Sequence, residues 1–313
     1  MNIQRTSSRK TGFTLMELMV AMAITTIIVT VLVSITSIAL ETWNRSRSEL
    51  RASRQAKGML EVMARDFEAL VVRRGNNSEW LSAVYDITGT SASSLPSPNA
   101  AKLIFFTAAT DRYDGNIGKP QDLGGDVSCV GYQLDYRDPI GRSGSNEFAT
   151  YVLSRLLVNP DETFRDLLGK PDLTAAFASR ATSLSDPKNF VCENIFQFTI
   201  TFHVQVSQAS SATPPVVTLV NVPIRLGKTN ATQTTNSFKI NGTGIDTPFG
   251  GGGLVSPAEL KGGKITAMEI SATVVSDFGV DQLKRRRFSG NQQAEFLAKN
   301  SYQYTKLVQL PSM

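Results

Sequence analysis

A long apolar run opens with the sequence Lys10-Thr11-Gly12-Phe13-Thr14-Leu15-Met16-Glu17-Leu18-Met19-Val20. From Leu18 to Leu40 the chain carries no charged residue. About 20 apolar residues allow an α-helix to cross a bilayer, because each residue adds ~1.5 Å of length. The run therefore predicts a transmembrane helix over residues 13–40.

One acidic residue, Glu17, lies just inside this run. An ionised carboxylate costs about 3 kcal/mol at the bilayer centre and less near the surface, so Glu17 calls for a partner. If the chain is cut after Gly12, Phe13 carries a free amino group, and residues 13 and 17 lie one above the other on a helix face. The ammonium and the carboxylate would then neutralise each other, within one chain or between neighbouring chains.

The residues from Gly12 to Glu17 resemble the class III leader of type IV pilins and type II secretion pseudopilins. In that family a prepilin peptidase cleaves after the glycine and methylates the new amino terminus. The resemblance implies that residues 1–12 are a leader peptide, that cleavage leaves Phe13 N-methylated, and that Glu17 is the assembly carboxylate. An ordinary signal peptide fits less well, because its apolar core is only about 7–15 residues long.

The leader is basic. Arg5, Arg9 and Lys10 precede the apolar run, and no acidic residue occurs before Glu17. The positive-inside tendency places this end in the cytoplasm and the bulk of the chain in the periplasm, anchored in the inner membrane by a single span. The net charge of +5 falls to +2 without these three cations, so charge gives no reason to expect a nucleic-acid partner.

An amphipathic pattern follows the apolar run. Apolar residues recur at helical spacing, and arginine and lysine lie mostly on the other side. These apolar residues are Trp43, Leu50, Ala56, Met59, Leu60, Met63, Phe67, Leu70 and Val71. Gly75-Asn76-Asn77-Ser78 is a helix-stop cluster. We therefore expect residues 41–75 to continue the transmembrane helix.

From about Trp80 the apolar period changes from 3.6 to 2, which indicates strands. The expected strands are 102–107, 126–136, 147–158, 194–207, 216–226 and 264–277, with short helices at 160–168 and 172–181. Residues 208–263 are rich in Ser, Thr, Asn, Pro and Gly and predict an excursion from the sheet. The fold class is α+β, in which the long helix packs on a mainly antiparallel sheet within a periplasmic head over residues 76–313.

Arg65-Asp66-Phe67 resembles the end of the amino-terminal helix in J-type minor pseudopilins and W-type minor pilins. Strand motifs at 130–134, 151–155, 195–202 and 265–277 follow the order of the J-type family. The length and insertions also resemble the prepilin-type C protein of a four-gene cassette found in Verrucomicrobia.

These resemblances imply a minor pseudopilin of a type II secretion pseudopilus, assembled into the filament or its tip. The implied partners are a prepilin peptidase, other pilin or pseudopilin subunits, the inner-membrane assembly platform and the membrane. Two alternatives remain open. One is a minor pilin of a type IV pilus, for adhesion, motility or DNA uptake. The other is a membrane-anchored periplasmic binding protein or enzyme.

No motif predicts catalysis, a cofactor or a metal site. His203, the single histidine, falls on the polar face of a strand pattern, so an HExxH zinc site is excluded. The glycines at 250–253 lack the Lys-Ser or Lys-Thr of a phosphate-binding loop. Residues 111–116 place Asp and Asn in a turn, but their spacing does not match a calcium-binding EF-hand.

The two cysteines, Cys129 and Cys192, would both lie on the oxidising side of the membrane, where a disulfide persists. The strand parities do not obviously point the two thiols at each other. Both alternatives remain open from sequence, a disulfide or two separate buried thiols.

Overall fold

The computed structural model describes residues 12–85, 101–108, 125–139, 149–209, 217–227, 233–285 and 290–310. The chain divides into two compact units, Met1–Ser48 and Glu49–Met313. Leader residues 1–11, the whole of 88–100, and the turn at 111–116 lie outside the described residues.

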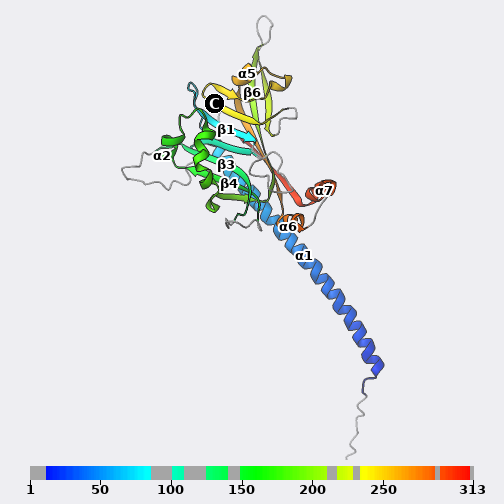
Figure 1. The fold of residues 1–313 in the computed structure, drawn as a ribbon. Coiled ribbons are helices and arrows are strands. Elements are labelled where there is room, and N and C mark those ends of the chain that lie inside the picture. The colour runs from blue at the N-terminus through cyan, green and yellow to red at the C-terminus, as the bar shows by residue number, and fades with distance from the viewer. Residues whose placement is uncertain are drawn as a thin grey trace, which may run out of the picture. The chain divides into compact units, whose positions relative to one another are not determined.

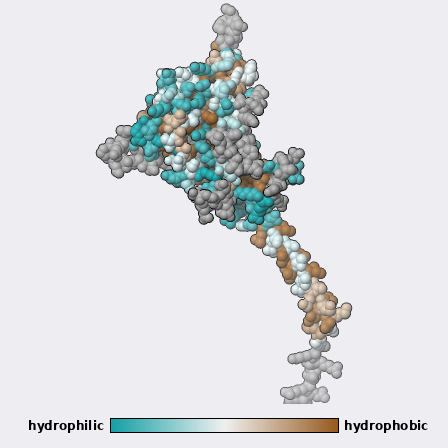
Figure 2. Space-filling model, viewed as in Figure 1, coloured by the Kyte–Doolittle hydropathy of each residue, from teal (hydrophilic) through white to brown (hydrophobic). Residues whose placement is uncertain are grey.

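Helix α1 runs from Leu15 to Glu68 (Figure 1). Every residue from 12 to 47 is exposed, and the surface of this part is largely hydrophobic (Figure 2). The helix is long and apolar enough to cross a membrane. Its threonines suit that setting, because the hydroxyls of Thr25, Thr26 and Thr30 each donate to the carbonyl four residues earlier, at 2.7–2.8 Å.

The helix ends earlier than the predicted residue 75, because its last turns are replaced by contacts with a strand. Leu70 forms an isolated antiparallel bridge with Thr107. The Val71 N–H donates to the Phe106 carbonyl at 2.9 Å, and the Ala108 N–H donates to the Ala69 carbonyl at 2.8 Å. These bonds pull the backbone of residues 69–71 out of the helix, although the apolar residues Leu70 and Val71 continue the helical spacing of the sequence.

The first sheet has seven strands in the order β10-β9-β1-β2-β3-β4-β5, and every pairing is antiparallel. Its strands are β1 (Glu79–Tyr85), β2 (Ala101–Thr107), β3 (Ser128–Arg137), β4 (Thr150–Val158), β5 (Phe190–Glu193), β9 (Ser237–Asn241) and β10 (Gly244–Asp246). The consecutive antiparallel pairing of β1 to β5 agrees with the alternating patterns in the sequence.

The second sheet has five strands in the order β12-β11-β6-β7-β8. Its strands are β6 (Ile195–Ala209), β7 (Val217–Leu226), β8 (Thr234–Thr235), β11 (Lys264–Val275) and β12 (Ser301–Gln309). All pairings are antiparallel except the short one between β7 and β8. The head is therefore α+β with antiparallel sheets, as the sequence predicts.

One large core joins residues 52–67 of α1 to the facing sides of both sheets. Phe67 of α1 stacks on Phe105 of β2 with ring centroids 4.1 Å apart. Phe202 of β6 stacks on Phe238 of β9, also at 4.1 Å, which ties the second sheet to the first. Aromatic pairs of this kind add to the free energy gained by burying apolar area.

The other face of the first sheet is covered by short helical segments. These are α2 (Pro160–Glu162), the π-helical turn η2 (Thr163–Leu167), α3 (Leu173–Phe177), η3 (Ala178–Arg180) and α4 (Ala181–Leu184). Phe177 and Trp80 are buried in this second core. The remaining helical segments are η4 (Pro187–Asn189), η5 (Gly251–Gly253), α5 (Pro257–Lys261), α6 (Asp277–Arg285) and α7 (Gly290–Asn300).

The excursion predicted over 208–263 is largely replaced by ordered sheet and helix. β9 pairs with β1, and β10 pairs with β9 through a tight turn at Gly242. α5 begins with a capping box between Ser256 and Glu259. Only residues 210–216 and 228–232 of this segment lie outside the described residues. The Asn-Gly pair at 241–242 is a hairpin signal that the polar composition obscured.

Candidate functional site

The start of α1 is stabilised by a capping box between Thr14 and Glu17. The Thr14 N–H donates to Oε2 of Glu17 at 2.9 Å, and the Thr14 hydroxyl donates to the same oxygen at 2.8 Å. The Glu17 N–H donates back to the Thr14 hydroxyl at 3.3 Å. In the uncleaved chain the carboxylate is thus bound to the helix start, where unpaired N–H groups attract negative charge.

The two residues flanking the expected cleavage position are open. The Phe13 side chain is 89% exposed. A Cβ added at Gly12 would meet no heavy atom within 4 Å, so the fold itself does not require glycine there. A requirement for glycine at this position would therefore come from whatever acts on the chain.

A buried ion pair joins α1 to the first sheet. Asp66 of α1 and Arg155 of β4 form two hydrogen bonds of 2.7 Å, from Nε to Oδ2 and from Nη2 to Oδ1. Their side chains are 1% and 8% exposed. The Tyr132 hydroxyl of β3 donates to the same carboxylate. Burial and the negative charge of Asp66 raise the pKa of Tyr132 well above its usual value, so this hydroxyl stays a donor.

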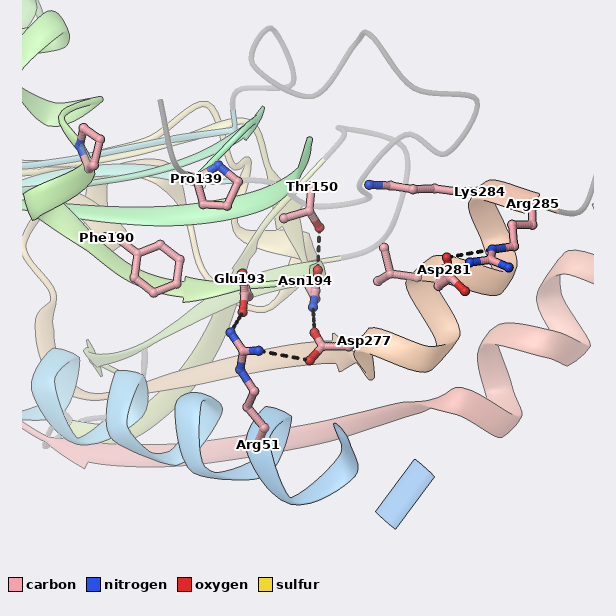
Figure 3. A pocket seen from close by; sticks show the side chains of 12 residues that line it. Arg51, Pro139, Thr150, Phe190, Glu193, Asn194, Asp277, Asp281, Lys284 and Arg285 are labelled. Carbon is pink, nitrogen blue, oxygen red and sulfur yellow. Dashed lines mark hydrogen bonds and ion pairs between the residues drawn. The ribbon is translucent and has the colours of Figure 1, made fainter. Parts of the chain in front are cut away.

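A cavity of about 840 Å³ opens beside residue 51 of α1 (Figure 3). Its lining combines carboxylates, cations and apolar side chains. These residues are Arg51, Pro139, Thr150, Pro187, Phe190, Glu193, Asn194, Asp277, Val280, Asp281, Lys284 and Arg285. Such a mixed lining is compatible with binding a polar surface, and it shows no nucleophile held by a general base.

Charges at one end of this cavity already pair with each other (Figure 3). Arg51 donates to Glu193 at 2.7 Å and to Asp277 at 3.5 Å. Asn194 donates to Asp277 at 2.7 Å and accepts from the Thr150 hydroxyl at 2.6 Å. The pairs therefore hold α1, β4, the β5–β6 junction and α6 together, so this end is a structural junction as well as a cavity wall.

Asn194 carries the backbone strain of this junction. Its φ is +60°, a left-handed conformation that Asn adopts more readily than most other residues. Its carbonyl accepts from the Val275 N–H at 2.9 Å. No sequence motif marks this residue, because its role depends on side chains brought together from distant segments.

The two cysteines lie in different cores and are free. Cys129 of β3 is opposite Val158, whereas Cys192 of β5 is opposite Leu153, five residues away along β4. An odd separation along a strand places the two on opposite faces of the sheet. Of the two alternatives left open by the sequence, the structure contains two separate buried thiols.

His203 of β6 is half-buried, and its Nε2 lies 3.9 Å from a carboxylate oxygen of Glu269 on β11. Within the described ranges, no group of three or more His, Cys, Asp and Glu side chains is arranged to hold a metal ion. The chain thus presents two distinct functional candidates, the amino-terminal segment and the head cavity.

Residues 7–33 match the family model of the prokaryotic N-terminal methylation motif. The chain carries a prepilin-type amino terminus. This motif indicates a type IV pilin-like structural subunit that is processed by a prepilin peptidase and assembles with other pilin subunits. Together with the exposed apolar helix, the prepilin-type amino terminus supports membrane anchoring. No curated protein and no solved structure matches the chain.

The roles of Gly12, Phe13 and Glu17 stay predictions, and the sequence reasoning missed the cap that Thr14 provides. A Thr followed three residues later by Glu, ahead of an apolar run, is a capping-box signal, so the sequence alone predicts this cap. The Asp66–Arg155 pair was not predictable, because the two residues are 89 positions apart in sequence.

Proposed function

We propose that this chain is a minor pseudopilin-like structural subunit of a type II secretion pseudopilus. The observation that carries the assignment to a filament subunit is the Gly12-Phe13 junction, followed by Glu17 at the start of an exposed apolar helix. The choice of a secretion pseudopilus rests on the resemblance of residues 65–67 to J-type minor pseudopilins. The transmembrane helix holds the subunit in the inner membrane with its head in the periplasm. Prepilin peptidase cleaves after Gly12 and methylates Phe13, and the subunit then enters the filament or its tip.

The geometry around Glu17 supports this sequence of events. In the uncleaved chain the carboxylate is satisfied by Thr14, so the precursor needs no other partner for it. Cleavage creates an ammonium group at Phe13, next to Thr14. Both bonds from Thr14 go to Oε2 and remain after cleavage, so Oε1 of Glu17 accepts from the amine of a neighbouring subunit, and the pairing of the two charges lowers the cost of placing both in lipid.

The mature amino terminus is the direct test. Mass spectrometry of the chain from cells that contain a prepilin peptidase should give a first residue of N-methylated Phe13. The variant Gly12→Ala should accumulate as the longer precursor. Because a Cβ added at Gly12 meets no neighbouring atom, a processing defect would not be a folding defect. Normal processing of Gly12→Ala would contradict the assignment.

A minor pilin of a type IV pilus is the alternative within the same class. Both assemblies use the same amino-terminal chemistry, so the head must decide between them. Deletion of the gene should block export of a secreted protein in the first case. In the second it should abolish adhesion, twitching or DNA uptake while export continues.

A membrane-anchored binding protein is favoured only by the 840 Å³ cavity. Much of its charge is paired internally, which reduces what is left to recognise a ligand. If the cavity binds the physiological ligand, Lys284→Ala should abolish function while filament incorporation stays normal. If the chain is a structural subunit, this variant should leave both unchanged.

A further inference from the structure

Strand β12 forms one edge of the second sheet, and it is long and regular. It pairs with β11 over nine consecutive residues without a bulge. Edges are normally protected by short strands, bulges or proline. The other three edge strands among the described residues follow this rule. β5 has four residues and a register shift, β10 has three residues, and β8 has two residues. The part of β7 beyond β8 is interrupted by Pro223.

The outward backbone groups of β12 can be identified from its ladder. The Leu310 N–H donates to the Thr266 carbonyl, so the even-numbered residues of β12 point their N–H and C=O groups towards β11. Backbone groups alternate along an antiparallel strand, so Gln303, Thr305 and Leu307 direct their N–H and C=O groups away from β11. Among the described residues, these outward groups bond to no other backbone group.

The side chains leave this edge open as well. Gln303, Thr305 and Leu307 are exposed, and Leu307 is 54% exposed. The one charged residue of the strand, Lys306, lies on the other face and pairs with Glu61 of α1 at 2.7 Å. The strand contains no proline. The edge therefore offers a row of backbone donors and acceptors flanked by neutral side chains, which an extended polypeptide can satisfy.

The direction of β12 argues against pairing with a second copy. Its start lies near Asp277, which contacts Arg51, and its Lys306 contacts Glu61, so β12 and residues 49–68 of α1 run the same way. An antiparallel pair of β12 strands would point residues 49–68 of the two α1 helices in opposite directions. This does not suit the proposed function, on which this step rests, because the subunits of one filament all point the same way. In a parallel pair, each residue bonds to the neighbours of the residue opposite it. The same odd-numbered residues would face across in both copies, so they could bond only after a shift of one residue, which a two-fold axis does not allow.

We propose that β12 is a docking strand, to which an extended segment of a different polypeptide adds as the sixth strand of this sheet. The added segment has neutral side chains opposite Gln303 and Thr305 and an apolar one near Leu307. Main-chain bonds supply the binding free energy, and the alternating side chains supply specificity. This interaction goes beyond the proposed function, because it gives the head a strand-binding edge that does not depend on the filament type.

Cross-linking in intact cells tests the geometry. A benzophenone amino acid is placed in turn at residues 303, 305 and 307 of the full-length chain, and at Leu254 as a control. Leu254 is a leucine with 49% exposure that belongs to no strand. The proposal expects the three strand positions to cross-link to one segment of one polypeptide, at points two residues apart and in order. Scattered attachment points, or the same products from Leu254, would overturn it.

A pair of substitutions at Thr305 isolates the backbone contribution. Thr305→Pro removes an outward N–H and leaves the bonds to β11 intact, as an edge strand tolerates. Thr305→Val keeps that N–H and the branched shape. The proline variant should lower the cross-linking yield at Leu307 by about tenfold, equivalent to about 1.4 kcal/mol, and the valine variant should not. Equal yields in the two variants would contradict strand addition.

Hydrogen exchange on the unmodified purified chain keeps the proposal testable if the proline variant misfolds. The amides of Gln303, Thr305 and Leu307 should exchange rapidly, while those of Tyr304 and Lys306, bonded to β11, should exchange slowly. Slow exchange at both sets would show that the edge is already covered within the chain, and the proposal would be wrong.

Discussion

The Asp66 carboxylate accepts two 2.7 Å hydrogen bonds from the Arg155 guanidinium in the interior of the head. Asp66 comes from α1 and Arg155 from β4, so the pair fixes the helix to the sheet. The carbonyl of Asp66 also accepts from the Thr107 hydroxyl of β2 at 2.8 Å. The Tyr132 hydroxyl of β3 donates to the carboxylate as well, so one helical residue is bonded to three strands.

Removing one partner of this pair should be strongly destabilising. Asp66→Asn leaves the Arg155 charge buried without its counter-charge, which costs about 3–5 kcal/mol. The free energy of unfolding, measured by urea titration of the full chain in detergent, should fall by that amount. The matched control is Asp281→Asn, which removes an exposed pair with Arg285 and should change stability by less than about 1 kcal/mol.

Replacing the whole buried group separates charge from packing. The triple variant Asp66→Leu, Arg155→Met and Tyr132→Phe leaves no unpaired polar atom from the original pair. It should be more stable than Asp66→Asn alone, because an apolar replacement removes the desolvation cost together with the bonds. If the triple variant is the less stable of the two, the pair contributes net stability beyond compensating its own burial.

Gly131 of β3 makes room for a ring from the helical layer. A Cβ at this position would lie 2.5 Å from Cζ of Phe177, which is 1% exposed. Gly131→Ala should therefore lower the free energy of unfolding by about 1–3 kcal/mol through overpacking. Gly58→Ala is the control, because its Cβ meets no atom within 4 Å and alanine is the better helix former by about 1 kcal/mol. Phe177→Leu should partly rescue Gly131→Ala, and a failure of rescue would place the strain elsewhere.

The sequence predicted the local features of the fold well and the distant ones poorly. The apolar run, the alternating strands and Glu17 are each visible within a few residues. The early end of α1 depends on Val71 bonding to Phe106, a contact that helical spacing cannot reveal. The junction around Asn194 likewise needs Thr150, Asp277 and a strained φ to coincide. Local periodicity carries no information on such pairings.

The buried cysteines predict a loss of stability in alkali. Burial raises the pKa of Cys192 to about 12 and also raises that of Cys129. An unfolded thiol has a pKa of about 8.5, so the folded state favours the neutral thiols. The contribution of the two neutral thiols to the free energy of unfolding is complete below about pH 8.5. It is lost as the pH rises towards their pKa in the folded state. The urea midpoint should therefore fall between pH 8 and pH 10.

Alkylation checks the same thiols directly. At pH 8 iodoacetamide should modify neither cysteine in the folded chain and both in urea without a reductant. If urea exposes no reactive thiol until a reductant is added, the two cysteines are bonded in the cell. That result would contradict their positions on opposite faces of the sheet.

Two roles of Glu17 can be separated by conservative changes at the start of α1. Glu17→Gln keeps the side-chain oxygen that accepts from Thr14, because glutamine also forms a capping box, but it removes the charge. Thr14→Val removes the hydroxyl, costs about 1 kcal/mol of helix stability, and keeps the carboxylate. If assembly depends on an ion pair with the Phe13 amine, recovery of subunits in sheared filaments should fall for Glu17→Gln and stay near normal for Thr14→Val. Both variants should still be cleaved after Gly12. Near-normal recovery for Glu17→Gln with a loss for Thr14→Val would instead mean that Glu17 acts only as a helix cap.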